Sequence, residues 1–389
     1  MKKFLVFFVV LLMGLSIFAE VGVTDTEIKL GSFQALSGPV AGIGVPMTQG
    51  MNAYFDWVNK NGGVHGRQIK LLVADDQFQP SRTNVEVRRL VENDKVFAIV
   101  GGLGTPGTLA VMDYLNNNKV PFVYQGSGAS VLSFPPKEYI FPVQPNYITE
   151  GNIVVNYLTE VKGAQRIAIV YRNAEDGIEF FESARDALQA KGMNFVEALA
   201  VAPDVTNFTA QVTRLRRARP DAILVMTFMP ATSNLVKQIR QFGMNDTDVL
   251  LTYSNSDVTF IGLTGAEAEN VEAMAWVNVD FTDSTTPALS IFNESFGTIP
   301  NAFAVAGMIA AETFTEALRR AGPNLTRDSL IKALETFDAW EGEIGPPLSY
   351  GSHNLADYSS RLGLGAMYVL KVENGTWVEA NTWIYADIK

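Results

Sequence analysis

The stretch VFAIVGGLGTPGT, residues 96–108, decides the fold predicted for this chain. Its apolar run of β-branched and aromatic residues is too short for a typical helix, and it stops at a glycine cluster before Thr105 and Pro106 open a helical pattern. Threonine is a good N-cap and proline is tolerated in the first helical turn, so the pattern predicts a strand, a tight turn and a helix capped by Thr105. Ligands of open α/β sheets bind at the carboxyl ends of such strands, and a helix N-terminus there favours an anion such as a carboxylate.

The glycines of this turn also admit a nucleotide-binding interpretation. Gly102, Gly104 and Gly107 have the spacing of the dinucleotide fingerprint. That fingerprint wants an acidic residue about 20 residues later, whereas the next predicted strand ends in Gln-Gly-Ser-Gly, residues 125–128. Thr108 stands where a phosphate-binding loop has lysine. A small-ligand cradle is therefore favoured over a nucleotide site, and a purely structural turn stays open as the alternative.

The N-terminus has the pattern of an export signal. Residues 1–19 contain two lysines, then an apolar core from 4 to 12, then small and apolar residues up to Ala19. The chain contains no cysteine, which excludes disulfides and a lipid-anchored N-terminal cysteine. We therefore expect a freely soluble exported protein that is not a lipoprotein.

Charge and length narrow the function further. The chain carries 41 acidic against 30 basic residues, a net charge of −11, so nucleic acid and anionic membrane surfaces are poor partners. Its 389 residues exceed a usual single core, which predicts two domains. The most apolar helical candidate, residues 303–318, is interrupted by Glu312 and Glu316, so no membrane helix is expected.

Short apolar runs alternate with amphipathic helical patterns along most of the chain. Strands that alternate with helices form parallel sheets, so the predicted fold class is α/β, with two sheets that each carry helices on both faces. The expected strands are residues 27–36, 68–74, 96–100, 121–124, 166–171, 195–201, 222–228 and 249–253, and the expected helices are residues 45–60, 81–93, 105–118, 150–161, 177–190, 208–217 and 232–242.

Two segments are expected to cross between the halves. Pro142 inside the run 139–144 argues against a central strand and suits a crossing segment, and residues 272–277 are a second candidate. An Asn-Gly pair at 374–375 is a strong hairpin signal. Beyond the second crossing the sequence predicts two helices that pack back on the first half, then a C-terminal hairpin: residues 302–321, 327–337 and 361–384.

The usual signatures of catalysis and metal binding are absent from the sequence. His65 and His353 are the two histidines, each in a glycine-flanked turn, and there is no Gly-x-Ser-x-Gly elbow or Asp-x-Asp-x-Asp calcium loop. Asp75 and Asp76 follow a strand and could do acid/base work, but acids beside a turn more often cap the chain. No catalytic residue, metal or cofactor is therefore expected.

Five short motifs run along most of the chain. They are Ser37-Gly38-Pro39, Asn59-x-Asn61-Gly62-Gly63-Val64-x-Gly66-Arg67, Asp75-Asp76, Arg166-Ile167-Ala168-Ile169-Val170 and Thr264-Gly265-x-x-Ala268-Glu269. In this order they resemble the type I periplasmic binding proteins of ABC importers, most closely the Leu/Ile/Val-binding branch. The resemblance implies two Rossmann-like lobes joined by three crossing strands, with the ligand cleft between them.

The resemblance also divides the chain. It places the three crossings near Pro142, Ala275 and Gly365. The division is then a signal peptide at 1–19, a first lobe at 20–142 and 276–365, and a second lobe at 143–275 and 366–389.

In the first lobe the family's binding site carries over well. The hydroxyl that holds the ligand carboxylate matches Thr105, with Leu103 and Gly104 beside it, which agrees with the helix-cap argument. The family's second hydroxyl position falls on Gly128, where neighbouring Ser127 could substitute.

In the second lobe the carry-over is poor. One aromatic position falls on Asp176, another on Phe228, and the glutamate that takes the ligand ammonium falls on Tyr253. Asp176, or Glu175 beside it, could restore a negative partner, and each could equally be an exposed loop acid. For the aromatic residues, ligand contact and packing between the lobes both stay open.

The resemblance and the strand ends together define a candidate ligand site and function. We expect a monomeric binding protein that delivers a branched-chain or other hydrophobic amino acid to an ABC permease in the membrane. A carboxylate without an amino group is the alternative ligand, and an extracellular ligand sensor is the alternative role. The candidate ligand-binding residues are Leu103, Gly104, Thr105, Gly126, Ser127, Gly128, Tyr171, Asp176, Phe228 and Tyr253.

Overall fold

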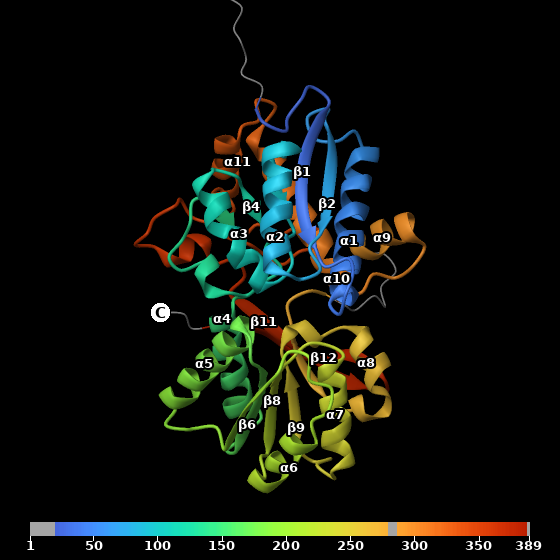
Figure 1. The fold of residues 1–389 in the computed structure, drawn as a ribbon, viewed down its shortest axis with the longest axis vertical. Helices are drawn as coiled ribbons and strands as arrows, with labels where there is room; N and C mark the ends of the chain where they lie inside the picture. The colour runs from blue at the N-terminus through green and yellow to red at the C-terminus, as the bar shows by residue number, and fades with distance from the viewer. Residues whose placement is uncertain (1–19, 279–285, 387–389) are drawn as a thin grey trace, which may run out of the picture.

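The computed structural model describes residues 20–278 and 286–386, so the predicted export signal lies outside the described residues. Figure 1 shows two α/β lobes stacked along the long axis of the molecule, each built around its own sheet. We call the lobe with the five-stranded sheet the first lobe and the lobe with the seven-stranded sheet the second lobe. Within the described ranges, no helix combines the length and the apolar character needed to cross a membrane.

The first sheet is parallel throughout, in the order β2-β1-β3-β4-β5. Its central strand β3 shows why a short apolar run suffices: Ala98 and Val100 join the core on one face, and Ile99 joins the core on the other. The strands are β1 (Glu27–Gln34), β2 (Gln68–Asp75), β3 (Ala98–Val100), β4 (Phe122–Val123) and β5 (Ile140–Phe141), and the helices around them are α1 (Ala41–Lys60), α2 (Pro80–Arg88), α3 (Thr105–Asn117), α9 (Pro287–Phe296), α10 (Ala302–Ala321) and α11 (Arg327–Leu334).

The second sheet has the order β12-β11-β10-β9-β8-β6-β7. Strands β6 to β10 are parallel, and β11 and β12 form the antiparallel hairpin predicted from Asn374-Gly375. The strands are β6 (Ile167–Arg172), β7 (Glu197–Val201), β8 (Ala222–Met226), β9 (Asp248–Leu251), β10 (Glu272–Ala275), β11 (Ala366–Glu373) and β12 (Thr376–Tyr385), and the helices are α4 (Tyr147–Asn156), α5 (Glu175–Ala190), α6 (Thr209–Ala218), α7 (Ala231–Gln241) and α8 (Val258–Thr264).

The predicted alternation of strands and helices is confirmed, with two additions and one correction. Helices α8 and α9 are short elements that the sequence patterns did not indicate. Helix α3 begins at Thr105, so the N-cap is Gly104 and the Thr105 side chain does not cap the helix. The turn needs a φ of 93° at residue 104, a conformation that glycine adopts without strain, and this moves the cap one residue ahead of the threonine.

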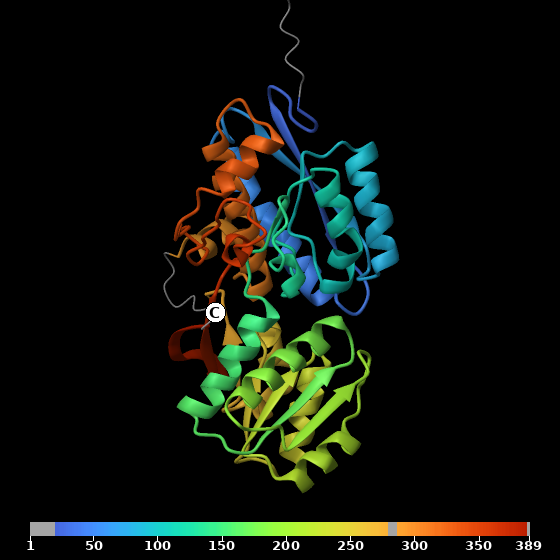
Figure 2. The ribbon, with the colours of Figure 1, turned by 90° about the vertical axis from the view of Figure 1, so that its left-hand side faces the viewer.

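The chain passes between the lobes three times, after β5, after β10 and before β11. Strand β5 is the edge of its sheet and ends at Phe141, because the next residue, Pro142, has no N–H to donate. Figure 2 shows α4 descending directly from this first crossing into the second lobe.

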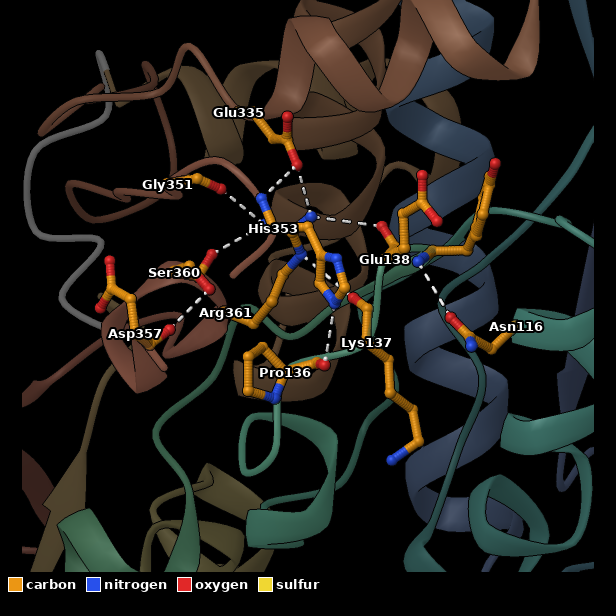
Figure 3. Close-up of polar contacts among 11 residues, drawn as sticks. Asn116, Pro136, Lys137, Glu138, Glu335, Gly351, His353, Asp357, Ser360 and Arg361 are labelled. Atoms are coloured by element: carbon orange, nitrogen blue, oxygen red, sulfur yellow. Dashed lines mark hydrogen bonds and ion pairs between the residues drawn. The ribbon is translucent and has the colours of Figure 1, made fainter. Parts of the chain in front are cut away.

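A buried arginine ties the third crossing to the first. The Arg361 guanidinium donates to the carbonyl oxygens of Lys137 and Glu138 at 3.2 Å each, and to Glu335 Oε1 at 2.7 Å (Figure 3). Its guanidinium carbon lies 4.2 Å from the ring centroid of Phe141. Because the planar guanidinium serves several fixed acceptors at once, Arg361 holds the two crossing segments in a defined geometry.

Candidate functional site

A mostly apolar cavity of about 80 Å³ lies between the two lobes and is lined from both. Space of that size holds about five to eight water molecules, and so fits one small organic ligand. The residues that line the cavity are Val40, Ile43, Met47, Phe78, Leu103, Gly104, Thr105, Tyr124, Gly126, Gln144, Tyr147, Glu150, Asp176, Met226, Phe228, Thr252, Tyr253, Ser254, Ser256, Trp276, Val277, Ala302, Phe303 and Ala306.

The apolar wall of the first lobe rests on the close contact of α1 and α10. A Cβ at Gly50 would overlap the carbonyl oxygen of Ala304, and a Cβ at Gly307 would overlap that of Met47. Glycine at these two positions lets the helix backbones touch. The contact brings Met47 and Ala306 together at one side of the cavity.

The floor of the cavity is a cluster of hydroxyl groups. Thr105 Oγ1 lies 2.7 Å from Ser127 Oγ and 3.2 Å from the Tyr147 hydroxyl, and only 2 % of Thr105 is exposed. The Phe78 ring packs so closely on Gly104 that a Cβ there would overlap the ring. The predicted threonine therefore does face the space between the lobes, but its hydroxyl is shared with two protein hydroxyls, one from each lobe. A ligand carboxylate there would add to this cluster or replace the longer Tyr147 bond.

A glutamine on the first crossing organises the wall next to this floor. With the Gln144 amide oriented to satisfy all its neighbours, its oxygen accepts from the amides of Ser127 and Gly128 at 3.3 and 3.2 Å and from the Tyr253 hydroxyl at 2.6 Å. Its nitrogen then donates to the Tyr124 hydroxyl at 3.0 Å. The Ser127 and Gly128 amides are thereby engaged within the protein.

The negative charge of Asp176 is already balanced in the structure. This side chain is 1 % exposed, pairs with the Arg172 guanidinium and accepts from the Gly177 N–H at 2.7 Å. Burial raises the pKa of the Asp176 carboxyl, and the Arg172 charge opposes that rise. The Arg172 guanidinium carbon in turn lies 4.4 Å from the ring centroid of Phe228. Asp176 is thus a buried member of an ion pair on the cavity wall and not an exposed loop acid.

A second acid on the cavity wall was not singled out by sequence reasoning. Glu150 lies in the first turn of α4 and is fully buried. Its Oε1 accepts from the backbone N–H of Tyr253 at 2.9 Å, and its Oε2 has no hydrogen-bond partner. Burial raises the pKa of Glu150 to about 8, and the Tyr253 N–H opposes this rise. Acids are common in the first turn of any helix, so no sequence signal separates this one from an ordinary N-terminal acid.

Sequence-based candidates fall into three groups in the structure. Ser127 and Gly128 lie behind the cavity wall, where Gly128 packs under the Tyr147 ring and the Tyr253 hydroxyl. Tyr171 points elsewhere, because its ring stacks on Phe181 with a centroid distance of 4.4 Å. The candidates that line the cavity are Leu103, Gly104, Thr105, Gly126, Asp176, Phe228 and Tyr253.

The acids at the end of β2 serve the fold. Asp76 accepts from the Phe78 N–H at 2.8 Å and the Thr83 hydroxyl at 2.6 Å, and Asp75 accepts from the Ser37 hydroxyl at 2.6 Å. They cap the turn, as favoured from the sequence, although Asp76 is buried. Among the residues that the structure describes, no group of three or more His, Cys, Asp or Glu side chains is placed to hold a metal ion.

Comparisons with known proteins agree with this architecture. Residues 27–376 match the family described as periplasmic binding protein. A Leu/Ile/Val-binding protein homolog of Brucella melitensis is 23 % identical over 321 residues, which cover 82 % of this chain and 86 % of the relative.

Two solved structures share the fold at similar levels. A branched-chain amino acid ABC transporter protein from Thermus thermophilus with bound valine has a TM-score of 0.83 at 20 % identity, covering 94 % of this chain and 98 % of the other. A fatty acid ABC transporter substrate-binding protein from Thermomonospora curvata has a TM-score of 0.82 at 23 % identity, covering 95 % of each chain. The fold is therefore shared by proteins whose names specify different ligands.

Proposed function

The chain belongs to the periplasmic binding protein family, and from that premise we propose that it binds a branched-chain or other hydrophobic amino acid and delivers it to an ABC permease. The observation that carries the proposal is the cavity itself, which is lined from both lobes and is mostly apolar. Such a surface suits an aliphatic or aromatic ligand side chain. The hydroxyls of Thr105 and Tyr147 supply donors for a ligand carboxylate.

Lobe closure would couple binding to delivery. A ligand that touches both lobes favours the conformation in which both sets of contacts are made, by the difference in its contact energy between the open and closed states. Thr105 and Leu103 in the first lobe and Phe228 and Tyr253 in the second line the same cavity, so one ligand can contact both lobes. The permease could then distinguish the ligand-bound protein from the free protein by its closed conformation.

The remaining parts of the proposal concern the mature chain. We propose export through the signal at residues 1–19, a soluble monomer in the periplasm without a lipid anchor, and lobes at 20–142 with 276–365 and at 143–275 with 366–389. The absence of cysteine from the sequence supports the lack of a lipid anchor. No catalytic role or cofactor is proposed, because the described residues that line the cavity include no histidine, cysteine or lysine that could serve as a nucleophile or its base.

A carboxylate without an amino group is a second candidate ligand. It is favoured by Tyr253, which stands where the resemblance expects the glutamate that takes an ammonium group. The similarity to a fatty acid binding protein in fold supports keeping it in the test.

Calorimetric titration of the purified protein tests the function and both ligand classes. We expect leucine or another hydrophobic amino acid to bind with a stoichiometry of one and to change the fluorescence of Trp276, whose ring lines the cavity. Phenylalanine, valine and the deaminated analogues complete the panel. Binding of the deaminated acids alone would replace the amino acid proposal by the second candidate, and no binding by any member of the panel would contradict both.

A further inference from the structure

We propose that Glu150 binds the ammonium group of the ligand, in place of the acid that the second lobe lacks at Tyr253. This inference rests on the proposed function and assigns to the same cavity a ligand class, primary amines that also carry a carboxylate. It stands on the position of Glu150, its unused oxygen and the charges around the cavity.

The first observation is the incomplete hydrogen bonding of a fully buried carboxyl group. Glu150 Oε1 accepts one bond, from the Tyr253 N–H at 2.9 Å, while Oε2 has no partner. An ionised carboxylate has about four acceptor positions, and leaving a buried charge unpaired is strongly unfavourable. Without a partner the buried group therefore stays protonated, and it can ionise only when a cationic donor enters the cavity; an ammonium group has three N–H donors for this.

The second observation is the charge balance of the cavity. Within the described part of the chain, the lining includes two acids, Glu150 and Asp176, and no lysine, arginine or histidine. Asp176 is neutralised by Arg172 behind the wall. The titratable side chains that interact with Glu150 are Tyr147 on its own helix and Tyr253 on the neighbouring turn η4 (Tyr253–Asn255), and both are uncharged phenols. The cavity is thus complementary to one positive charge.

The third observation is the position of Glu150 relative to the hydroxyl floor. Tyr147 and Glu150 are three residues apart on α4, so their side chains leave the same face of the helix with Cβ atoms about 5–6 Å apart. The Tyr147 hydroxyl contacts Thr105, where a carboxylate would lie. An α-amino acid places its ammonium and carboxylate groups on one carbon, so both anchors must line one small cavity, as Glu150 and Thr105 do.

Protonation gives the proposal a distinct signature. With its pKa at about 8, Glu150 is mostly neutral at pH 7 in the free protein, and pairing with an ammonium group requires it to ionise. Binding near neutral pH then releases protons to the buffer, up to one per ligand. Affinity rises with pH up to about 8 and levels off above it. A neutral Glu150 that merely donates to a ligand oxygen would release no proton.

The test compares wild type with Glu150→Gln and with Glu175→Gln, an exposed acid in the first turn of the neighbouring helix α5. The probes are leucine and its deaminated analogue 4-methylpentanoate, titrated in phosphate and in Tris to count protons. We expect Glu150→Gln to weaken leucine binding by about 30-fold or more, and to change 4-methylpentanoate binding by less than about threefold. Glu175→Gln should leave both affinities unchanged, and thermal melting should show all three proteins folded.

The possible results distinguish failure of the Glu150 assignment from failure of the proposed function. If wild type binds leucine but Glu150→Gln binds it equally well, the role of Glu150 is overturned while the proposed function stands. If wild type binds 4-methylpentanoate and not leucine, the amino acid proposal and the role of Glu150 both fail.

Discussion

Glu150 and Glu312 are both buried glutamates that accept hydrogen bonds from distant parts of the chain, yet they differ in how many bonds they accept. Glu312 on α10 accepts the backbone N–H groups of Glu343, Ile344 and Gly345, at 2.7 Å, 3.2 Å and 2.9 Å. Glu150 lines the cavity, accepts one N–H through Oε1 and has no hydrogen-bond partner at Oε2 among the described residues.

A buried acid with a structural role and one that can bind a ligand differ in the hydrogen bonding of their carboxyl oxygens. Burial raises the pKa of both carboxyls, so titration alone does not distinguish them. What differs is the number of hydrogen bonds. Both carboxyl oxygens of Glu312 accept N–H groups from the loop at 343–345, whereas Oε2 of Glu150 has no donor within the described ranges of the protein. The same contrast separates Asp176, saturated by Arg172 and Gly177, from Glu150 on the same cavity wall.

Removing the saturated acid is expected to have the largest effect. Glu312→Ala removes the acceptor of three backbone N–H groups, of which that of Gly345 is buried and those of Glu343 and Ile344 are partly buried, so the free energy of unfolding should fall by about 3 kcal/mol. Urea denaturation followed by circular dichroism measures this loss. The exposed Glu341→Ala nearby serves as the control and should be neutral. A loss below about 1 kcal/mol would show that the three bonds do not hold the loop.

Glu150 makes the stability of the ligand-free protein depend on pH. Because the pKa of Glu150 is raised above its value in the unfolded chain, the folded state binds the extra proton, and stability is lost as pH rises from about 4.5 through about 8. Glu150→Gln removes this dependence, so the variant should gain on wild type by up to about 1.4 kcal/mol per pH unit in that range. Thermal unfolding of both proteins at pH 5, 6, 7 and 8 without ligand measures the difference. Parallel pH profiles would contradict the raised pKa.

The smallest expected effect concerns the hydroxyl floor. Thr105→Val removes one donor to a ligand carboxylate while keeping the shape, so carboxylate ligands should bind about 1–3 kcal/mol more weakly. Thr105→Ser keeps the hydroxyl and should bind like wild type. Unchanged affinity in Thr105→Val, measured by calorimetry, would remove Thr105 from the site and leave the Tyr147 hydroxyl as the anchor in this cluster.

Much of the fold could be predicted because it depends on local periodicity. The eight predicted strands are all present, as β1 to β4 and β6 to β9, since runs such as 98–100 are apolar on both faces and too short for a helix. The missed helix α8 has seven residues, too few for a helical period to emerge.

The site was predictable only in part. The predicted glycine turn does line the cavity, because the ends of a strand and a helix follow from the local sequence. The hydrogen-bond partners of a buried acid do not follow from the local sequence in the same way. Asp176 pairs with Arg172 in its own strand-helix unit, but Glu150 accepts from Tyr253, more than a hundred residues away.

The sequence by itself determined the α/β class, the alternation of strands and helices and the family resemblance, because these depend on residue patterns along a short stretch of chain. Only the tertiary structure decided that Thr105 shares its hydroxyl across the lobes, that Tyr171 turns away from the cavity and that Glu150 is buried with an unused oxygen. Those properties arise from desolvation and hydrogen bonding between distant segments, and they exist only once the two lobes are packed around one cavity.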